Sequence, residues 1–179
     1  MLNIGIDIDD TLTKTSELAN EILHQNEEYK GILDYHNLDK KTLDFFIRKN
    51  IEKIQNDVEL NESAKEVIDY LKDNGCKIIF ITARGSLGLE NLIPITKKYL
   101  SNKEIYYDKI IFKQESKVDA CIKNNIDIFI DDKEKVLDEI KKANIKTLRF
   151  CSSKTISKHE KVSNWLEVKD YIDKILKEK

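Results

Sequence analysis

Residues 1–15, MLNIGIDIDDTLTKT, place the carboxylates of Asp7, Asp9 and Asp10 at the carboxyl end of an apolar run from Leu2 to Ile8. A nearly continuous apolar run that is rich in Ile is typical of a strand covered on both faces. In such a strand, residues two apart point to the same side, so Asp7 and Asp9 should project together from its carboxyl end. Carboxylates this close repel each other unless one is protonated or a cation compensates them.

Four further apolar runs follow the first one: KIIFI (77–81), KIIF (109–112), DIFI (127–130) and KTLRF (146–150). The segments between them show helical periodicity, most clearly at residues 64–71, 136–142 and 165–176. Alternation of buried strands with helices predicts a doubly wound α/β fold, in which right-handed crossovers place helices on both faces of a parallel sheet.

Local signals indicate where some of these helices begin or end. Asn74-Gly75 predicts the C-cap of the helix that starts near Ala64. Ser116, followed three residues later by Asp119, predicts the start of a helix that runs through Lys123. Pro94 predicts the start of a helix over residues 95–100.

Residues 14–60 interrupt the alternation, because they contain no convincing strand. Amphipathic patterns around residues 18–23 and 43–54 indicate helices, with an irregular stretch near 29–37 between them. The sequence therefore predicts two units, an α/β core formed by residues 1–13 and 61–179 and a small helical cap formed by residues 14–60.

Composition excludes several classes of function. The formal net charge of −2 gives no general attraction to nucleic acid polymers. No run approaches the roughly 18 apolar residues of a membrane span, and nothing at the N-terminus resembles a signal peptide. The three cysteines are far apart and form no CxxC pattern, which indicates neither a disulfide framework nor a zinc site. We expect a cytoplasmic protein with no membrane partner; the sequence leaves its oligomeric state open.

More candidate site residues follow the other strands. Asp131 and Asp132 come directly after DIFI, and open α/β sheets bind ligands at the carboxyl ends of their strands. Mg²⁺, a hard cation that prefers oxygen ligands, would relieve the repulsion between these acids and Asp7.

Other residues at the same edge suit an anion. Thr82 ends KIIFI, where its hydroxyl and the backbone amides after it can bind a phosphate oxygen. Lys117 lies where a helix should begin, a position unfavourable for a cation by up to about 1 kcal/mol unless an anion is near.

Together, Asp7-Ile8-Asp9-Asp10-Thr11, Thr82, Lys117 and Asp131-Asp132 resemble, in that order, the four motifs of the haloacid dehalogenase (HAD) superfamily of phosphohydrolases. The resemblance covers the chain except for the insertion, which looks like a C1-type helical cap on the Rossmann-like HAD core. It implies a Mg²⁺-dependent phosphomonoester hydrolase that acts on a small molecule through an aspartyl-phosphate.

The resemblance also implies a role for each residue. Asp7 would be the nucleophile, and Asp9 would protonate the leaving group and then activate water. Mg²⁺ would be held by the Asp7 carboxylate, the backbone carbonyl of Asp9 and the Asp131 carboxylate, with Asp132 behind them. The phosphate would be bound by Thr82, Ala83, Arg84 and Lys117.

Within the superfamily, IFITARG and SKVDACIKNNIDIFIDD resemble the 5′(3′)-deoxyribonucleotidases and their bacterial relatives, which implies a nucleoside 5′-monophosphate as substrate. Members of that group bind the base with aromatic cap residues, for which Tyr29 and Tyr35 are candidates here. Phe45 and Phe46 are better explained as the core of the cap.

Two other functions remain in competition. The first is the same chemistry on a sugar phosphate or another small phosphometabolite. The second is a phospho-accepting receiver domain of a signalling system, which shares the fold and an acidic Mg²⁺ pocket. The order of the residues argues against a receiver. In a receiver the Thr and the Lys follow the phospho-accepting Asp, whereas in this chain Thr82 and Lys117 precede the second acidic pair.

Overall fold

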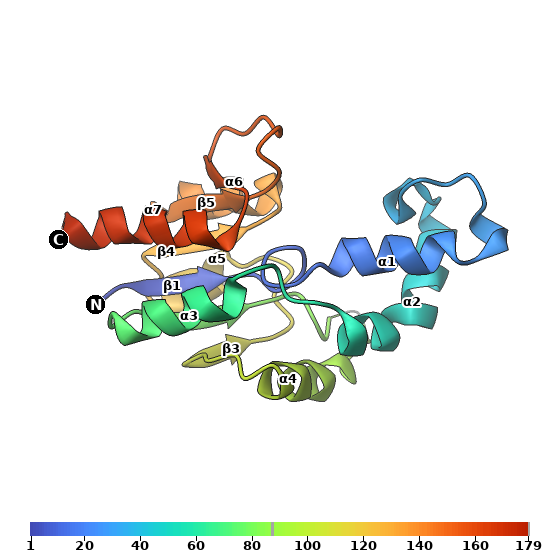
Figure 1. Ribbon diagram of the computed structural model, residues 1–179, viewed down its shortest axis with the longest axis horizontal. Coiled ribbons are helices and arrows are strands. Elements are labelled where there is room, and N and C mark those ends of the chain that lie inside the picture. The colour runs from blue at the N-terminus through green and yellow to red at the C-terminus, as the bar shows by residue number, and fades with distance from the viewer. Residues whose placement is uncertain (87, 179) are drawn as a thin grey trace.

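A six-stranded sheet forms the centre of the protein (Figure 1) in the computed structural model, which describes residues 1–86 and 88–178. The strand order is β3-β2-β1-β4-β5-β6, and every neighbouring pair is parallel. The strands are β1 (Asn3–Ile6), β2 (Lys77–Ile81), β3 (Lys109–Ile111), β4 (Ile128–Asp131), β5 (Lys146–Phe150) and β6 (Glu160–Val162). The predicted doubly wound parallel sheet is confirmed.

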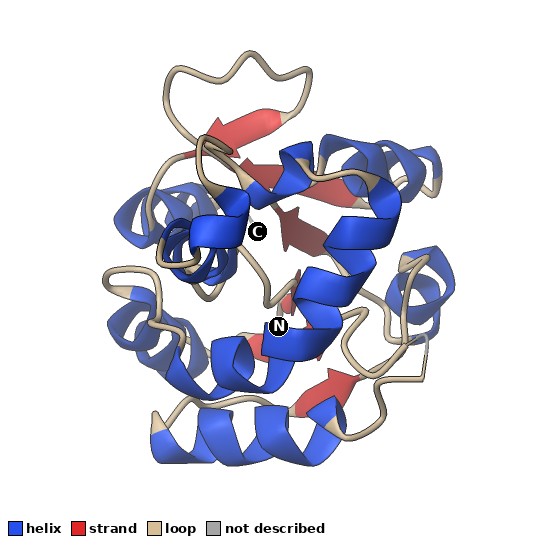
Figure 2. Cartoon of the chain, turned by 90° about the vertical axis from the view of Figure 1, so that its right-hand side faces the viewer, coloured by secondary structure: helices blue, strands red, loops and turns tan. Residues whose placement is uncertain are grey.

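Helices cover both faces of this sheet, as Figure 2 shows from the end of the molecule. The larger core cluster joins one face to α3 (Ala64–Asp73) and α7 (Trp165–Lys177), with contributions from α4 (Leu92–Asn102). A smaller cluster joins the other face to α5 (Val118–Lys123) and α6 (Glu134–Lys142). The two clusters explain why the strands are apolar on both sides.

Gly5 lets Phe129 of the second cluster pack closely against β1. A Cβ atom at this position would lie 2.5 Å from Cδ2 of Phe129, the neighbouring residue on β4. The missing side chain of β1 therefore provides the space that the Phe129 ring fills.

The segment after β1 forms a helical insert that lies beyond the carboxyl ends of the strands (Figure 1). It consists of α1 (Thr15–His24), the short 3₁₀ helices η1 (Glu27–Tyr29) and η2 (Tyr35–Asn37), and α2 (Lys40–Asp57). The insert has an apolar cluster of its own, which contains Phe46 at 1% exposure, whereas Phe45 is 58% exposed.

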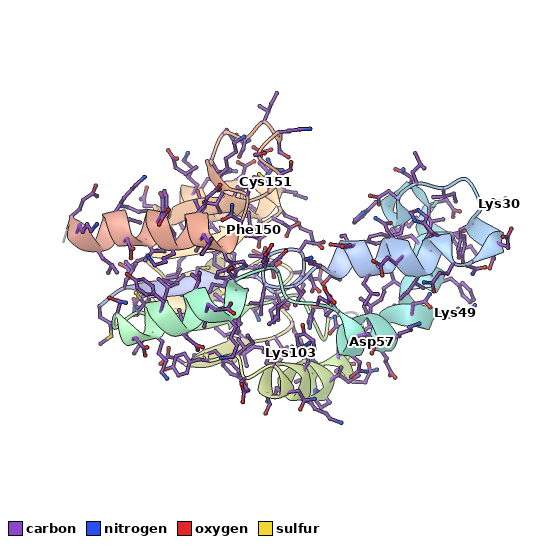
Figure 3. All side chains as sticks on the ribbon, viewed as in Figure 1. Lys30, Lys49, Asp57, Lys103, Phe150 and Cys151 are labelled. Carbon is purple, nitrogen blue, oxygen red and sulfur yellow. The ribbon has the colours of Figure 1, made fainter. Side chains whose placement is uncertain are left out.

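The chain enters and leaves this insert through two adjacent connections. The backbone N–H of Lys14 donates to the carbonyl of Glu59, and that of Asn61 donates to the carbonyl of Leu12. The C-terminal end of α2 packs against α4 of the core, and Asp57 at that end is labelled in Figure 3. These contacts agree with an insertion near residues 14–60, while its standing as a separate cap remains a prediction.

Several local predictions were wrong in detail. β1 ends at Ile6 rather than Ile8, because the N–H groups of Leu12 and Thr13 fold back onto the carbonyl of Ile8. Helix α5 begins at Val118 with Lys117 in the N-cap position and no side-chain cap, so Ser116 does not start it.

Two other elements also differ from the sequence reading. Helix α4 begins at Leu92, before Pro94, and strand β6 was not predicted. In the described part of the chain, no helix combines the length and apolar character needed to cross a membrane.

Candidate active site

The predicted acidic residues meet where β1 and β4 end. Asp7 follows β1, and its backbone N–H donates to the carbonyl of Ile130 at 2.9 Å, which keeps it beside the end of β4. Asp131 is the last residue of β4 and is fully buried. Parallel pairing of two central strands therefore brings together residues that are more than 120 positions apart.

Lys117 joins these two carboxylates. Its Nζ atom lies 2.6 Å from Oδ1 of Asp7 and 2.7 Å from Oδ2 of Asp131, and its side chain is 5% exposed. Burial alone would lower the pKa of Lys117, but the two carboxylates outweigh it and raise that pKa above its ordinary value. The ammonium group is thus held in its charged form among acids.

Asp132 completes an acidic cluster with Asp7 and Asp131, in which one carboxylate oxygen of each residue lies within 4.8 Å of the others. Burial is the main cause that raises the pKa of Asp7 to about 7 and that of Asp132 to about 8, and neighbouring carboxylates raise both further. Lys117 opposes the shift at Asp7. Ionisation of Asp7 and Asp132 is therefore unfavourable in this site.

The donor set of this cluster fits a hard cation. Within the described residues, Oδ1 of Asp132 is buried without a hydrogen-bond partner, although buried carboxylate oxygens are normally paired. An orphaned oxygen beside two further carboxylates is the environment that a hard divalent ion stabilises. Asp132 belongs to this cluster itself, whereas we had expected it to lie behind the ligands.

The carboxylate of Asp9 lies outside that cluster and forms a bidentate ion pair with Arg84. Nε of Arg84 donates to Oδ2 at 3.1 Å, and Nη2 donates to Oδ1 at 2.7 Å. The hydroxyl of Thr15, at the start of α1, also donates to Oδ1 at 2.8 Å. Burial opposes ionisation of Asp9, but Arg84 outweighs it and holds the pKa of that carboxyl below its usual value.

Asp10 shapes the turn that leads into the insert. Its backbone has a φ of 57°, and its carboxylate accepts hydrogen bonds from the backbone N–H and the hydroxyl of Ser16. Because Ser16 lies in the first turn of α1, Asp10 compensates donors that the helix leaves unpaired.

Thr82 and Ala83 follow β2 at the same edge of the sheet. The hydroxyl of Thr82 is buried and accepts a hydrogen bond from the backbone N–H of Arg84 at 3.1 Å. Ala83 is exposed. This hydrogen bond lies within the loop after β2. Neither Thr82 nor Ala83 takes part in the ion pairs of Lys117 with Asp7 and Asp131.

A cleft of about 920 Å³ opens between the insert and this edge of the core. Asp9, Asp10, Asp132 and Lys133 are among the residues that line it. The insert contributes residues from α1, η2 and α2, and the core contributes Phe150, the last residue of β5, and Cys151 after it, both labelled in Figure 3.

Comparison with known proteins places this geometry in context. No protein-family model matches the chain. A protein of Oceanobacillus iheyensis named "Putative nucleotidase" is 29% identical over 165 residues, which cover 83% of this chain and 86% of the relative.

Solved structures share the whole fold. One, described as a putative beta-phosphoglucomutase of Thermotoga maritima, has a TM-score of 0.72 at 12% identity and covers 98% of this chain and 100% of its own. A HAD-superfamily hydrolase of Ehrlichia chaffeensis has a TM-score of 0.62 at 18% identity, with 97% of both chains covered. The chain shares the fold of these HAD-superfamily structures. The resemblance inferred from its four sequence motifs is thereby confirmed.

A third cation, Lys133, lies near the acids and was not predicted from the sequence. Lys133 lines the cleft, and its backbone N–H donates to Oδ1 of Asp131 at 2.8 Å. Burial alone would lower the pKa of Lys133, but the nearby carboxylates, Asp132 and Asp7 above all, outweigh it and raise that pKa. Lys133 directly follows Asp131 and Asp132 in the sequence, and this adjacency could have indicated a site residue.

Arg84 also occupies a position that the sequence did not indicate. We had expected it to bind phosphate, and here its guanidinium is engaged by Asp9. Chemically, the site combines a carboxylate beside a buried ammonium, an acidic cluster that fits a cation, and a second carboxylate held at the cleft.

Proposed function

We propose that this HAD protein hydrolyses small phosphomonoesters with Mg²⁺ as cofactor and Asp7 as nucleophile. The observation that carries the proposal is the contact of Lys117 with both Asp7 and Asp131, beside the free oxygen of Asp132. A carboxylate that could act as the nucleophile, a fixed positive charge and a cluster that fits a cation would then share one buried site, which supports the proposal.

Each residue then has a role in the proposed reaction. A carboxylate oxygen of Asp7 attacks phosphorus while the bond to the leaving oxygen breaks. Asp9, which Arg84 holds ionised, first takes up a proton from water and then gives it to that oxygen. Asp9 next takes a proton from the water that cleaves the aspartyl-phosphate and releases inorganic phosphate. Lys117, Thr82 and the backbone amide of Ala83 bind the phosphoryl oxygens, with Arg84 at the edge of this group.

Asp7, Asp131 and Asp132 would hold the Mg²⁺ ion, together with the backbone carbonyl of Asp9. When bound, it supplies the charge neutralisation that lets an anionic nucleophile approach an anionic phosphate.

For the substrate, we propose a nucleoside 5′-monophosphate. The sequence relative with a nucleotidase name supports this choice, as does an aromatic surface in the cleft. The rings of Tyr35 and His36 lie 4.0 Å apart at 36°, and both residues line the cleft. A planar base can stack on such a surface, while the residues after β5 offer hydroxyl groups to a sugar.

A sugar phosphate is the second candidate. The core side of the cleft favours it, because Ser152, Thr155 and Ser163 are small and polar and suit a leaving group made of hydroxyls alone. In both cases we propose that residues 14–60 act as a cap over the site.

A phosphatase screen tests the proposal directly. Nucleoside monophosphates, sugar phosphates and p-nitrophenyl phosphate are incubated with the protein in Mg²⁺ or in EDTA, and released phosphate is measured. We expect Mg²⁺-dependent turnover that Asp7→Asn reduces more than about a thousandfold. Near-normal turnover by Asp7→Asn would reject the mechanism, and stable phosphorylation without turnover would favour the receiver function.

A further inference from the structure

A chain of buried polar groups connects Asp9 to the C-terminal end of the insert, where α2 returns to the core. Beyond its two bonds to Asp9, Arg84 donates from Nη1 to the hydroxyl of Thr96 on α4 at 3.2 Å. The same hydroxyl donates to Oε1 of Gln55 on α2 at 3.1 Å. Arg84, Thr96 and Gln55 are each at most 4% exposed, so the three form one network shielded from water.

The directions of these bonds leave little freedom in the network. The Thr96 hydroxyl has a single proton, which goes to Gln55, and it can therefore only accept from Arg84. The guanidinium is planar, so fixing Nη1 at Thr96 also fixes the fork that meets the Asp9 carboxylate. Loss of Thr96 would leave a buried guanidinium N–H unpaired.

Both ends of the insert meet at Asp9 as a result. Thr15, the first residue of α1, contacts Asp9 directly, and Gln55, in the last turn of α2, reaches it through Thr96 and Arg84. Gln55 also lines the cleft. The position of a group in the cleft and the orientation of Asp9 are therefore connected by contacts within one network.

We propose that Gln55 and Thr96 are positioning residues, which hold Arg84 so that the Asp9 carboxylate is set for its work on the leaving group. The inference rests on the proposed phosphatase function for its kinetic consequence, but the network itself can be tested without activity.

The first test examines the network in the metal-free protein. The sequence contains three arginines, Arg48, Arg84 and Arg149, so a spectrum of ¹⁵N-labelled arginine shows three Nε–Hε signals, and Arg84→Lys identifies one of them. We expect Thr96→Val and Gln55→Met to speed the exchange of the Arg84 Hε with water about tenfold, because the guanidinium loses its anchor. An unchanged exchange rate would overturn the proposal.

The second test uses leaving groups that differ in their need for a proton. An alkoxide requires general acid help, whereas p-nitrophenolate leaves readily without it. We expect Thr96→Val to lower kcat for an alkyl phosphate about tenfold and kcat for p-nitrophenyl phosphate by less than about threefold. An equal loss for both substrates would contradict a positioning role.

Tyr99→Phe is the matched control. Its hydroxyl donates to the carbonyl of Val58 at 2.8 Å, so it also joins α4 to the end of α2 through one buried hydrogen bond, without contacting Asp9. If Tyr99→Phe reproduces the effects of Thr96→Val, the network only docks the helices and the proposal fails. If the wild-type protein hydrolyses no phosphomonoester while the exchange results hold, the proposed function fails and the network stands.

Discussion

Nζ of Lys117 lies 2.6 Å from Oδ1 of Asp7, and each of the two side chains is only 5% exposed. A charge buried this deeply is costly unless an opposite charge compensates it, so each residue depends on the other. The same ammonium group contacts Asp131, which extends the dependence to the end of β4. The contacts of Lys117 with Asp7 and Asp131, which would serve catalysis, therefore also affect the free energy of unfolding.

Lys117→Met should destabilise the metal-free protein. The substitution leaves two buried carboxylates without their cation, and breaking such a pair typically costs about 3–5 kcal/mol. Urea denaturation in EDTA measures the change, and added Mg²⁺ should recover part of it. Lys113→Met is the control, because Lys113 pairs with Glu90 on the surface and should change stability by less than about 1 kcal/mol. Equal losses in the two variants would contradict the prediction.

The stability of the metal-free protein should fall as the pH rises from about 5 to 8. The pKa values of Asp7, about 7, and Asp132, about 8, lie above the ordinary value of 3.8, so the folded state binds protons more readily than the unfolded state in this range. Stability that depends on these bound protons is lost as they dissociate. Asp9 has a lowered pKa, so its effect falls below this range.

Thermal unfolding in EDTA at several pH values measures this dependence. Asp132→Asn should make the decline shallower, since it removes one of the two groups. Mg²⁺ should stabilise the wild-type protein more at pH 8 than at pH 5, because the ion binds ionised carboxylates. Parallel curves for the wild type and Asp132→Asn would contradict the assignment.

Gly5→Ala should weaken the core of the sheet. A Cβ atom at this position would lie 2.5 Å from the Phe129 ring, so the ring or the strand must move, and overpacking of this kind costs about 1–3 kcal/mol. Urea denaturation of the variant measures the loss. A free energy of unfolding equal to that of the wild type would show that Phe129 can move at no cost.

The sequence was sufficient for the parts of the fold that depend on burial. The runs at 77–81 and 146–150 are strands with the predicted bounds, because residues covered on both faces must be apolar. Strand β6 was not predictable in this way, since two of its three residues are exposed and only Val162 is buried.

Some of the site residues could also be predicted from the sequence, and others could not. Asp7, Asp131 and Lys117 could be placed near one another, because strand and helix ends meet at the same edge of a parallel sheet. The pairing of Arg84 with Asp9 could not, since the two residues are 75 positions apart and side-chain directions in loops decide the contact. Thr96 and Gln55 carry no motif and are linked to the site only through Arg84.

Recognition of the leaving group should depend on His36. Its exposed ring packs on Tyr35 at the edge of the cleft, and Tyr35 itself is fixed by a hydrogen bond between its hydroxyl and that of Ser16. Stacking of a base on an aromatic side chain is worth about 1–3 kcal/mol. His36→Ala should therefore raise KM for a nucleoside monophosphate at least about fivefold while kcat changes little.

His24→Ala provides the comparison for this variant, because His24 also lies on the insert but bonds to the carbonyl of Leu33 and does not line the cleft. It should leave KM unchanged. Steady-state kinetics with a nucleoside monophosphate and with ribose 5-phosphate separate the two substrate classes, since a sugar phosphate has no base to stack. If His36→Ala raises KM equally for both, the ring does not bind a base, and the sugar phosphate becomes the better candidate.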